Sequence, residues 1–126
     1  MLLGVVSDTH NNLKNIESII TLFNEREVDL VIHTGDITNS KSLDKFSQLR
    51  CHMICVYGNN DRSESGLEEI AIKNKFELEH PPYITKIAGK KIAIFHEPEK
   101  INEFLSKNID LDVILHGHTH RHREEI

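Results

Sequence analysis

The sequence has 126 residues, of which 38% are hydrophobic and 28% are charged, and its formal net charge is −5. This length suits one hydrophobic core, so we expect residues 1–126 to form a single domain. The composition argues against extensive disorder, collagen-like repeats and a disulfide scaffold. The acidic balance argues against nucleic-acid binding, which needs a basic patch. One count is high: nine histidines, four of which fall between His116 and His122.

The two cysteines and the N-terminal segment bear on location. Cys51 and Cys55 lie in an apolar run, which favours two buried thiols in a reducing compartment over a metal site. The first residues lack a basic stretch and turn polar at Ser7, so they predict a strand and not a signal peptide. No apolar run approaches the ~20 residues of a membrane span. We therefore expect a cytoplasmic protein that does not enter a membrane.

Apolar runs alternate with helical patterns in the first half. Buried strands are expected at residues 2–6, 30–32 and 53–57. Apolar residues at helical spacing predict helices at 13–23, from the early forties to 49, and within 66–75. Ser40 and Ser42 are the two candidate N-caps of the second helix. Strands joined by helices in this way pair in parallel, with right-handed crossovers.

The second half has a different pattern. Pro81 and Pro82 break the chain, and two apolar segments at 83–88 and 91–95 then flank Gly89 and Lys90. This arrangement predicts an antiparallel hairpin. A short helix from about 98 to 107 is expected to lead into a last strand at 113–115. The elements together predict an α/β fold.

Metal-binding residue types follow five of the expected strands. In chain order they are Asp8 and His10, then Asp36, Asn59 and His96, and finally His118 and His120. Ligands of open α/β sheets bind at the carboxyl ends of the strands, so these side chains can converge. Carboxylate and imidazole groups suit Mn²⁺, Fe, Co²⁺, Ni²⁺ or Zn²⁺. Seven ligands exceed the needs of one tetrahedral ion, which predicts two ions that share a carboxylate.

Each of these residues alone has an ordinary explanation. An aspartate after a strand is more often a turn or N-cap residue than a ligand, and a lone histidine is usually a surface residue. The joint pattern at five strand ends is what favours a metal centre. The other five histidines keep the ordinary interpretation; they are His33, His52, His80, His116 and His122.

The ordered motifs resemble those of the calcineurin-like metallophosphoesterase superfamily, and of its small prokaryotic phosphodiesterase branch. They are Asp8-Thr9-His10, Gly35-Asp36, Gly58-Asn59-Asn60-Asp61, His96 and Gly117-His118-Thr119-His120. The resemblance implies a four-layer α/β/β/α sandwich. It also implies that one metal takes Asp8, His10 and His120, that the other takes Asn59, His96 and His118, and that Asp36 bridges them.

The activity implied by the resemblance is hydrolysis of a small phosphoester, most readily a phosphodiester. A hydroxide bridging two divalent metals would attack phosphorus in line. Mn²⁺ is the favoured ion, with Ni²⁺, Fe, Co²⁺ and Zn²⁺ as alternatives. Arg62 is a candidate for neutralising a phosphate oxygen, with a solvated surface role equally open. Asp61 is a candidate for orienting a neighbour by hydrogen bonds.

Three departures from the family pattern leave an alternative open. Asn60 stands where many members have a histidine, and an amide cannot serve as a general acid. Glu97 follows His96 where glycine is usual, and the sequence stops at Ile126, before the last strands of the family. The alternative is a scaffold or binding subunit with this fold and little turnover. The substrate and homo-oligomerisation are left open.

Overall fold

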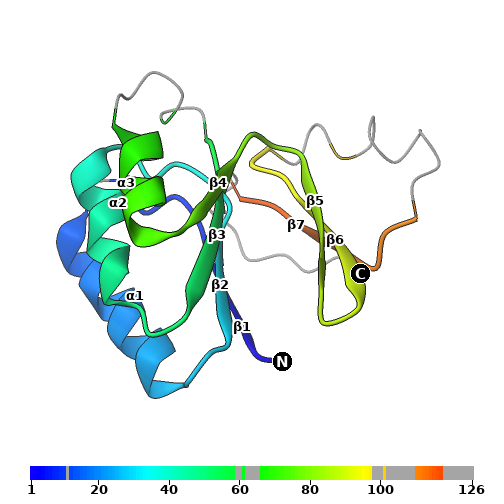
Figure 1. Ribbon diagram of the computed structural model, residues 1–126, viewed down its shortest axis with the longest axis horizontal. Helices are drawn as coiled ribbons and strands as arrows, with labels where there is room; N and C mark the ends of the chain where they lie inside the picture. The colour runs from blue at the N-terminus through cyan, green and yellow to red at the C-terminus, as the bar shows by residue number, and fades with distance from the viewer. Residues whose placement is uncertain (11, 59–60, 62–65, 98–100, 102–109, 118–126) are drawn as a thin grey trace.

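A computed structural model of the chain describes residues 1–10, 12–58, 61, 66–97, 101 and 110–117. These residues form an α/β fold with two β-sheets, as the sequence predicts. Figure 1 shows helices covering one face of the first sheet, and the second sheet on the opposite side. In the described part of the chain, no helix has the length and apolar character needed to cross a membrane.

The first sheet has four parallel strands in the order β1-β2-β3-β4. Their bounds are Leu3–Val6, Leu30–His33, His52–Val56 and Glu77–Glu79. The first three agree with the predicted strands within two residues at each end. Strand β4 was not predicted, because its three residues include one apolar side chain between two glutamates. Right-handed crossovers that step in one direction place all the connecting helices on one face.

Those helices are α1 (Leu13–Glu25), α2 (Ser40–Lys45) and α3 (Leu67–Asn74), and a 3-10 turn at Phe46–Gln48 extends α2. The predicted N-cap of α2 is wrong. Asn39 caps it instead, because its Oδ1 accepts a hydrogen bond from the Ser42 backbone N–H at 2.9 Å. Asparagine competes well with serine for this position, so the choice among neighbouring polar residues could not be made from sequence.

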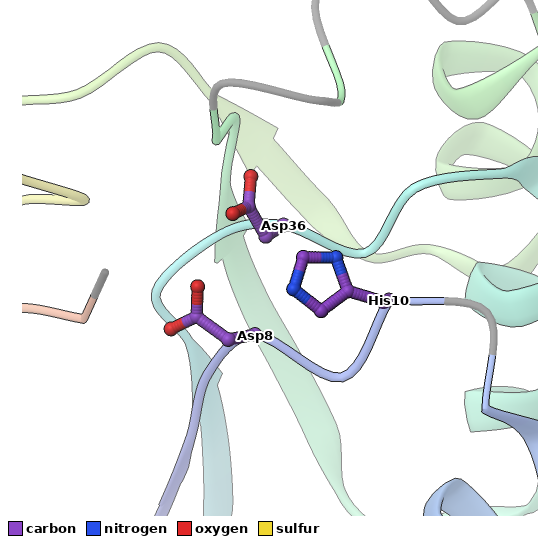
Figure 2. A group of neighbouring side chains, drawn as sticks. All are labelled: Asp8, His10 and Asp36. Atoms are coloured by element: carbon purple, nitrogen blue, oxygen red, sulfur yellow. The ribbon is translucent and has the colours of Figure 1, made fainter. Parts of the chain in front are cut away.

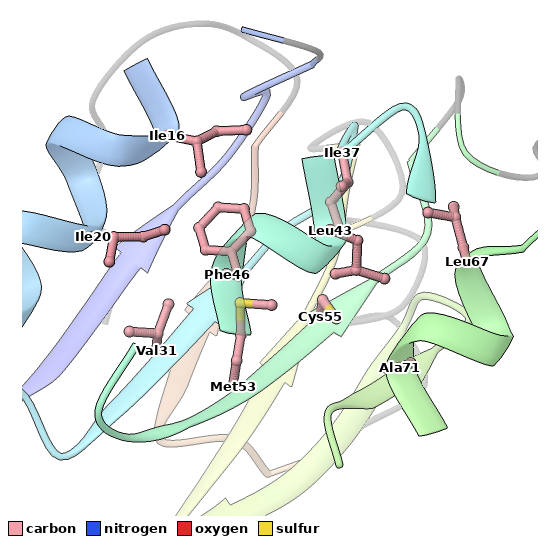
Figure 3. Close-up of a cluster of buried hydrophobic side chains, with 10 residues drawn as sticks. All are labelled: Ile16, Ile20, Val31, Ile37, Leu43, Phe46, Met53, Cys55, Leu67 and Ala71. Atoms are coloured by element: carbon pink, nitrogen blue, oxygen red, sulfur yellow. The ribbon is translucent and has the colours of Figure 1, made fainter. Parts of the chain in front are cut away.

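The helices bury an apolar face against the first sheet (Figure 3). Ile16 and Ile20 of α1 lie one helical turn apart and both point inward, as their four-residue spacing predicts. On β2 and β3, alternate residues point to this face. The buried cluster comprises Ile16, Ile20, Val31, Ile37, Leu43, Phe46, Met53, Cys55, Leu67 and Ala71.

The second sheet has the order β5-β6-β7, with bounds Tyr83–Ile87, Lys90–Ile94 and Val113–Leu115. The predicted hairpin of β5 and β6 is confirmed, and β7 pairs parallel to β6. Because Ile87 pairs with Lys90, the two loop residues are Ala88 and Gly89, one position earlier than the sequence analysis expected. Their φ values of 52° and 79° suit the primed turns of two-residue hairpins.

A layer whose buried members are all aliphatic joins the two sheets. Its buried members are Leu30, Ile32, Ile54, Val56, Ile87, Ile92 and Ile94. A smaller cluster on the outer face of the second sheet includes Phe95 and Ile101. Ile101 belongs to the helix predicted at 98–107, whose other residues all lie outside the described part of the chain. The described layers are therefore helices, sheet and sheet, with the carboxyl ends of β1, β2 and β3 at one edge.

Candidate metal centre

Three of the predicted ligands meet at that edge. One ligand atom from each of Asp8, His10 and Asp36 lies within 4.8 Å of the other two. Figure 2 shows their side chains gathered between the loop that follows β1 and the loop that follows β2. Two carboxylates and one imidazole form a donor set that suits a borderline divalent cation. The described residues therefore fit the kind of ion that the sequence predicts.

The backbone of these loops is unusual. Asp8, His10 and Asp36 have φ values of 53°, 49° and 62°, in the left-handed region that residues other than glycine seldom adopt. Such conformations cost free energy, persist only where surrounding contacts fix them, and concentrate at functional sites. Two hydrogen bonds link the loops: Asp8 N–H donates to Gly35 O, and His10 N–H donates to Asp36 O, both at 2.9 Å. The ligands are therefore presented by two mutually braced loops.

His96, two residues after the end of β6, brings the second sheet to the same place. Its Nε2 lies 3.5 Å from Asp36 Oδ2, and both side chains are almost fully buried. Its Nδ1 lies 2.8 Å from the Thr34 carbonyl oxygen. Because that oxygen can only accept, Nδ1 carries a proton and Nε2 is the ring atom that faces Asp36. The arrangement fixes one ring nitrogen as the candidate ligand atom.

Two glycines permit this close approach. A Cβ at Gly35 would stand 2.6 Å from His96 Nδ1, and a Cβ at Gly58 would run into Asp36. Gly117, at the end of β7, is equally tight, since a Cβ there would overlap the Ser7 hydroxyl and stand 2.6 Å from Thr34 Oγ1. The ends of all five strands expected to carry ligands therefore lie together.

Asp61 lies behind the cluster and does not belong to it. Its buried carboxylate accepts three backbone N–H groups, from Asp36 and Gly58 at 2.8 Å each and from Thr38 at 2.6 Å. These bonds connect the loop after β2 to the loop after β3. The orienting role of Asp61 toward the reaction stays a prediction.

Several predicted site residues lie outside the described part of the chain. They are Asn59, Asn60, Arg62, His118 and His120. Their proposed roles stay predictions. The described residues bring together the other predicted ligands: Asp8, His10, Asp36 and His96.

Three polar residues that support the cluster were not predicted from the sequence. Thr38 Oγ1 lies 3.3 Å from His10 Nδ1. Thr9 and His33 are buried and hydrogen-bonded to each other at 2.9 Å. The available signals were the position of Thr9 between two ligands and the presence of a histidine on a strand whose other residues are apolar.

A family model described as a calcineurin-like phosphoesterase superfamily domain matches residues 1–126. The chain belongs to this superfamily. The match confirms the resemblance carried by the strand-end motifs, and the α/β fold described above is the fold of this superfamily. Membership supports a phosphoesterase function and implies divalent metal ions, in agreement with the cluster of Asp8, His10 and Asp36.

Individual relatives agree with the family match. A phosphodiesterase of Methanocaldococcus jannaschii is 34% identical over 122 residues, which are 95% of this chain and 74% of that protein. A second protein of that archaeon, named a probable metallophosphoesterase, is 34% identical over 121 residues, which are 95% of this chain and 59% of that protein. A solved archaeal phosphodiesterase superposes with a TM-score of 0.87 at 33% identity, covering 100% of this chain and 78% of its own.

Proposed function

We propose that the chain is a divalent-metal-dependent phosphodiesterase, with residues 1–126 acting as one calcineurin-like domain. The reaction is hydrolysis of a small phosphodiester, for which two bound ions would supply an activated hydroxide. The observation that carries the proposal is the convergence of Asp8, His10 and Asp36 at the carboxyl edge of the first sheet. The phosphodiesterase relatives supply the reaction class.

Seven side chains are proposed to hold the ions. Asp8, His10 and His120 take one, Asn59, His96 and His118 take the other, and Asp36 bridges. When bound, divalent ions lower the pKa of water toward neutrality and offset the charge on phosphate oxygens. The net charge of −5 fits this view, because the positive charge that attracts phosphate then comes from the ions. Mn²⁺ is the ion we expect, ahead of Ni²⁺, Fe, Co²⁺ and Zn²⁺.

The protein's own groups would position the substrate and the ligands. Asp36 would contribute to holding both ions, and the Asp61 carboxylate holds the Asp36 backbone by accepting its N–H. Arg62 is proposed to neutralise a phosphate oxygen. Asn60 can donate a hydrogen bond but no proton, so substrates with good leaving groups, such as aryl diesters, should react fastest. A cytoplasmic location, the absence of a nucleic-acid substrate and any self-association stay predictions.

The test combines metal removal with substitution. We expect the chelated protein to lose hydrolysis of a chromogenic aryl phosphodiester and to regain it with Mn²⁺ or Ni²⁺. Asp36→Ala should abolish both turnover and metal binding. Asp112→Asn is the matched control, because Asp112 is exposed and lies at the opposite end of β7 from Gly117. Turnover that survives both chelation and Asp36→Ala would refute the proposal.

The same experiment tests the scaffold alternative. A protein that binds two Mn²⁺ ions, measured by elemental analysis, yet hydrolyses no member of a phosphomonoester and phosphodiester panel would be a binding subunit with this fold. The fold alone does not decide between these functions. The ligands present at Asp8, His10, Asp36 and His96 favour the enzyme.

A further inference from the structure

His33 occupies a core position that an apolar side chain would ordinarily fill. It is the last residue of β2 and is fully buried, on the helix-covered face that it shares with Val31. Its ring meets the edge of Phe46, with centroids 5.6 Å apart and ring planes at 88°. A buried polar ring costs free energy unless its nitrogens are hydrogen-bonded. Both nitrogens of His33 are.

One hydrogen bond reaches the loop that follows β1, and the other reaches the loop that follows β2. The Gly35 backbone N–H donates to Nδ1 at 3.1 Å, so Nδ1 is the acceptor. Nε2 therefore carries the ring proton, and Nε2–H donates to Thr9 Oγ1 at 2.9 Å. The ring is neutral in this arrangement. Burial also lowers the pKa of His33 to about 4, which agrees with a neutral ring near pH 7.

These partners lie in the two loops that carry the candidate ligands. Thr9 stands between Asp8 and His10, and Gly35 directly precedes Asp36. We propose that His33 is a positioning residue that joins the loops after β1 and β2 through a single neutral ring and so holds Asp8, His10 and Asp36 ready for a cation. The proposal rests on the proposed function, since it assigns His33 a role toward the same ions.

The strained backbone explains why such a link is needed. Asp8, His10, Asp36 and also Thr38 have left-handed φ values, which relax unless neighbouring contacts hold them. The backbone bonds from Asp8 and His10 brace the loops directly. His33 braces them from inside the core, where Phe46 and the strand backbone fix the ring. A phenylalanine at this position would fill the volume but make neither hydrogen bond.

The first experiment separates positioning from simple stability. His33→Phe is compared with Val31→Ala, a buried substitution on the same strand and the same face, whose apolar side chain makes no hydrogen bond to either loop. Both variants should unfold at lower urea than the wild type. We expect His33→Phe to weaken Mn²⁺ binding, measured by calorimetry, by about tenfold or more, the range typical of groups that orient metal ligands. Val31→Ala should bind Mn²⁺ as the wild type does.

Equal Mn²⁺ affinities of His33→Phe and the wild type would overturn the proposal. So would an equal loss of affinity in Val31→Ala, because the effect would then follow stability alone.

A double-mutant cycle tests the link itself. Thr9→Val keeps the shape of the side chain and removes the acceptor of the Nε2 proton. Both substitutions break the same hydrogen bond between His33 and Thr9. Thr9→Val should therefore lower Mn²⁺ affinity, and adding it to His33→Phe should cause little further loss. Independent, additive losses would show that His33 and Thr9 do not act together and would overturn the proposal.

A readout without metal keeps this proposal separate from the proposed function. Hydrogen exchange at the Asp8 and His10 amides of the metal-free protein should speed up in His33→Phe and stay unchanged in Val31→Ala. If the wild type binds no Mn²⁺ but this exchange pattern appears, the loop link is supported and the metal function is refuted. If Mn²⁺ binds and the exchange does not change, the loop link is refuted.

Discussion

The two ends of the strands use aspartate in different ways. Where strands begin, Asp29 accepts the Leu2 backbone N–H and Asp112 accepts the Lys91 backbone N–H, both at 2.8 Å, and both bonds are exposed. Where strands end, Asp36 and Asp61 are only 3% and 1% exposed. The same residue type thus ties down a chain segment at one edge and forms a buried polar network at the other.

The difference in burial between these two pairs of aspartates bears on stability at one edge and on the candidate metal centre at the other. An exposed carboxylate stays hydrated and adds little, whereas a buried carboxylate is costly unless several donors surround it. The carboxyl edge carries these buried charges together with a run of left-handed residues, all close to the candidate metal ligands. An apolar edge would be more stable but could not bind a cation.

The largest effect is expected from removing the Asp61 carboxylate. Asp61→Ala leaves three buried backbone N–H groups, those of Asp36, Thr38 and Gly58, without their acceptor. At ~1–3 kcal/mol for each unsatisfied group, we expect a loss of at least about 3 kcal/mol in the free energy of unfolding. Asp29→Ala, at the amino edge, should cost about 1 kcal/mol or less. Urea unfolding measures the free energy of unfolding of both variants. Equal losses would show that aspartates at the two edges contribute alike to stability.

The next effect is a pH dependence at the carboxyl edge. Burial lowers the pKa of His33 from 6.5 to about 4, while nearby Asp61 and Asp8 oppose the shift and His96 and His10 add to it. Between these values the unfolded chain binds a proton that the folded protein does not. Stability from His33 is therefore complete above pH 6.5, falls as the pH drops toward 4, and changes no further below it. The loss should reach about 3 kcal/mol.

The control for this pH dependence is His33→Phe in the metal-free protein. The stability advantage of the wild type over this variant, measured by urea unfolding, should shrink between pH 6.5 and 4. An advantage that stayed constant over this range would mean that the ring is protonated in the folded state.

Sequence patterns predicted most of this fold. The continuous apolar runs of β1, β2 and β3 and the hydrophobic spacing of α1 report burial directly, so these elements were predictable. Strand β4 was not, because Glu77-Leu78-Glu79 carries too little apolar pattern and forms through its pairing with β3. The Asn39 cap depends on the backbone angles of one residue, which sequence pattern does not specify.

The candidate site was predictable in its ligands and not in its supports. Asp8, His10, Asp36 and His96 all follow recognisable strands, so topology alone brings them together. The roles of Thr9, Thr38 and His33 depend on which side chains face each other across loops, and no periodic pattern encodes that. His33 was misleading for a physical reason, because a histidine on an apolar strand gives no sign of what its two nitrogens contact.

A pair of glycines tests how tightly the carboxyl edge is packed. In Gly58→Ala the new Cβ would collide with the backbone and carboxylate of Asp36. We expect a loss of about 2 kcal/mol in stability, as for other overpacked sites, and weaker Mn²⁺ binding because Asp36 must move. Gly89→Ala, in the β5–β6 hairpin, meets no described atom within 4 Å and has φ +79°. It should cost about 1 kcal/mol of backbone strain and leave Mn²⁺ binding unchanged.

The smallest effects test whether every buried polar group near this edge serves the site. Asn39→Ala removes the N-cap of α2 and should cost about 1 kcal/mol. Ser42→Ala should instead raise stability by about 0.5 kcal/mol, since the buried Ser42 hydroxyl has no hydrogen-bond partner among the described residues and alanine favours a helix. Thermal unfolding with calorimetry can resolve the two signs. Destabilisation by Ser42→Ala would extend the buried polar network into α2, whereas stabilisation limits it to the loops that carry Asp8, His10 and Asp36.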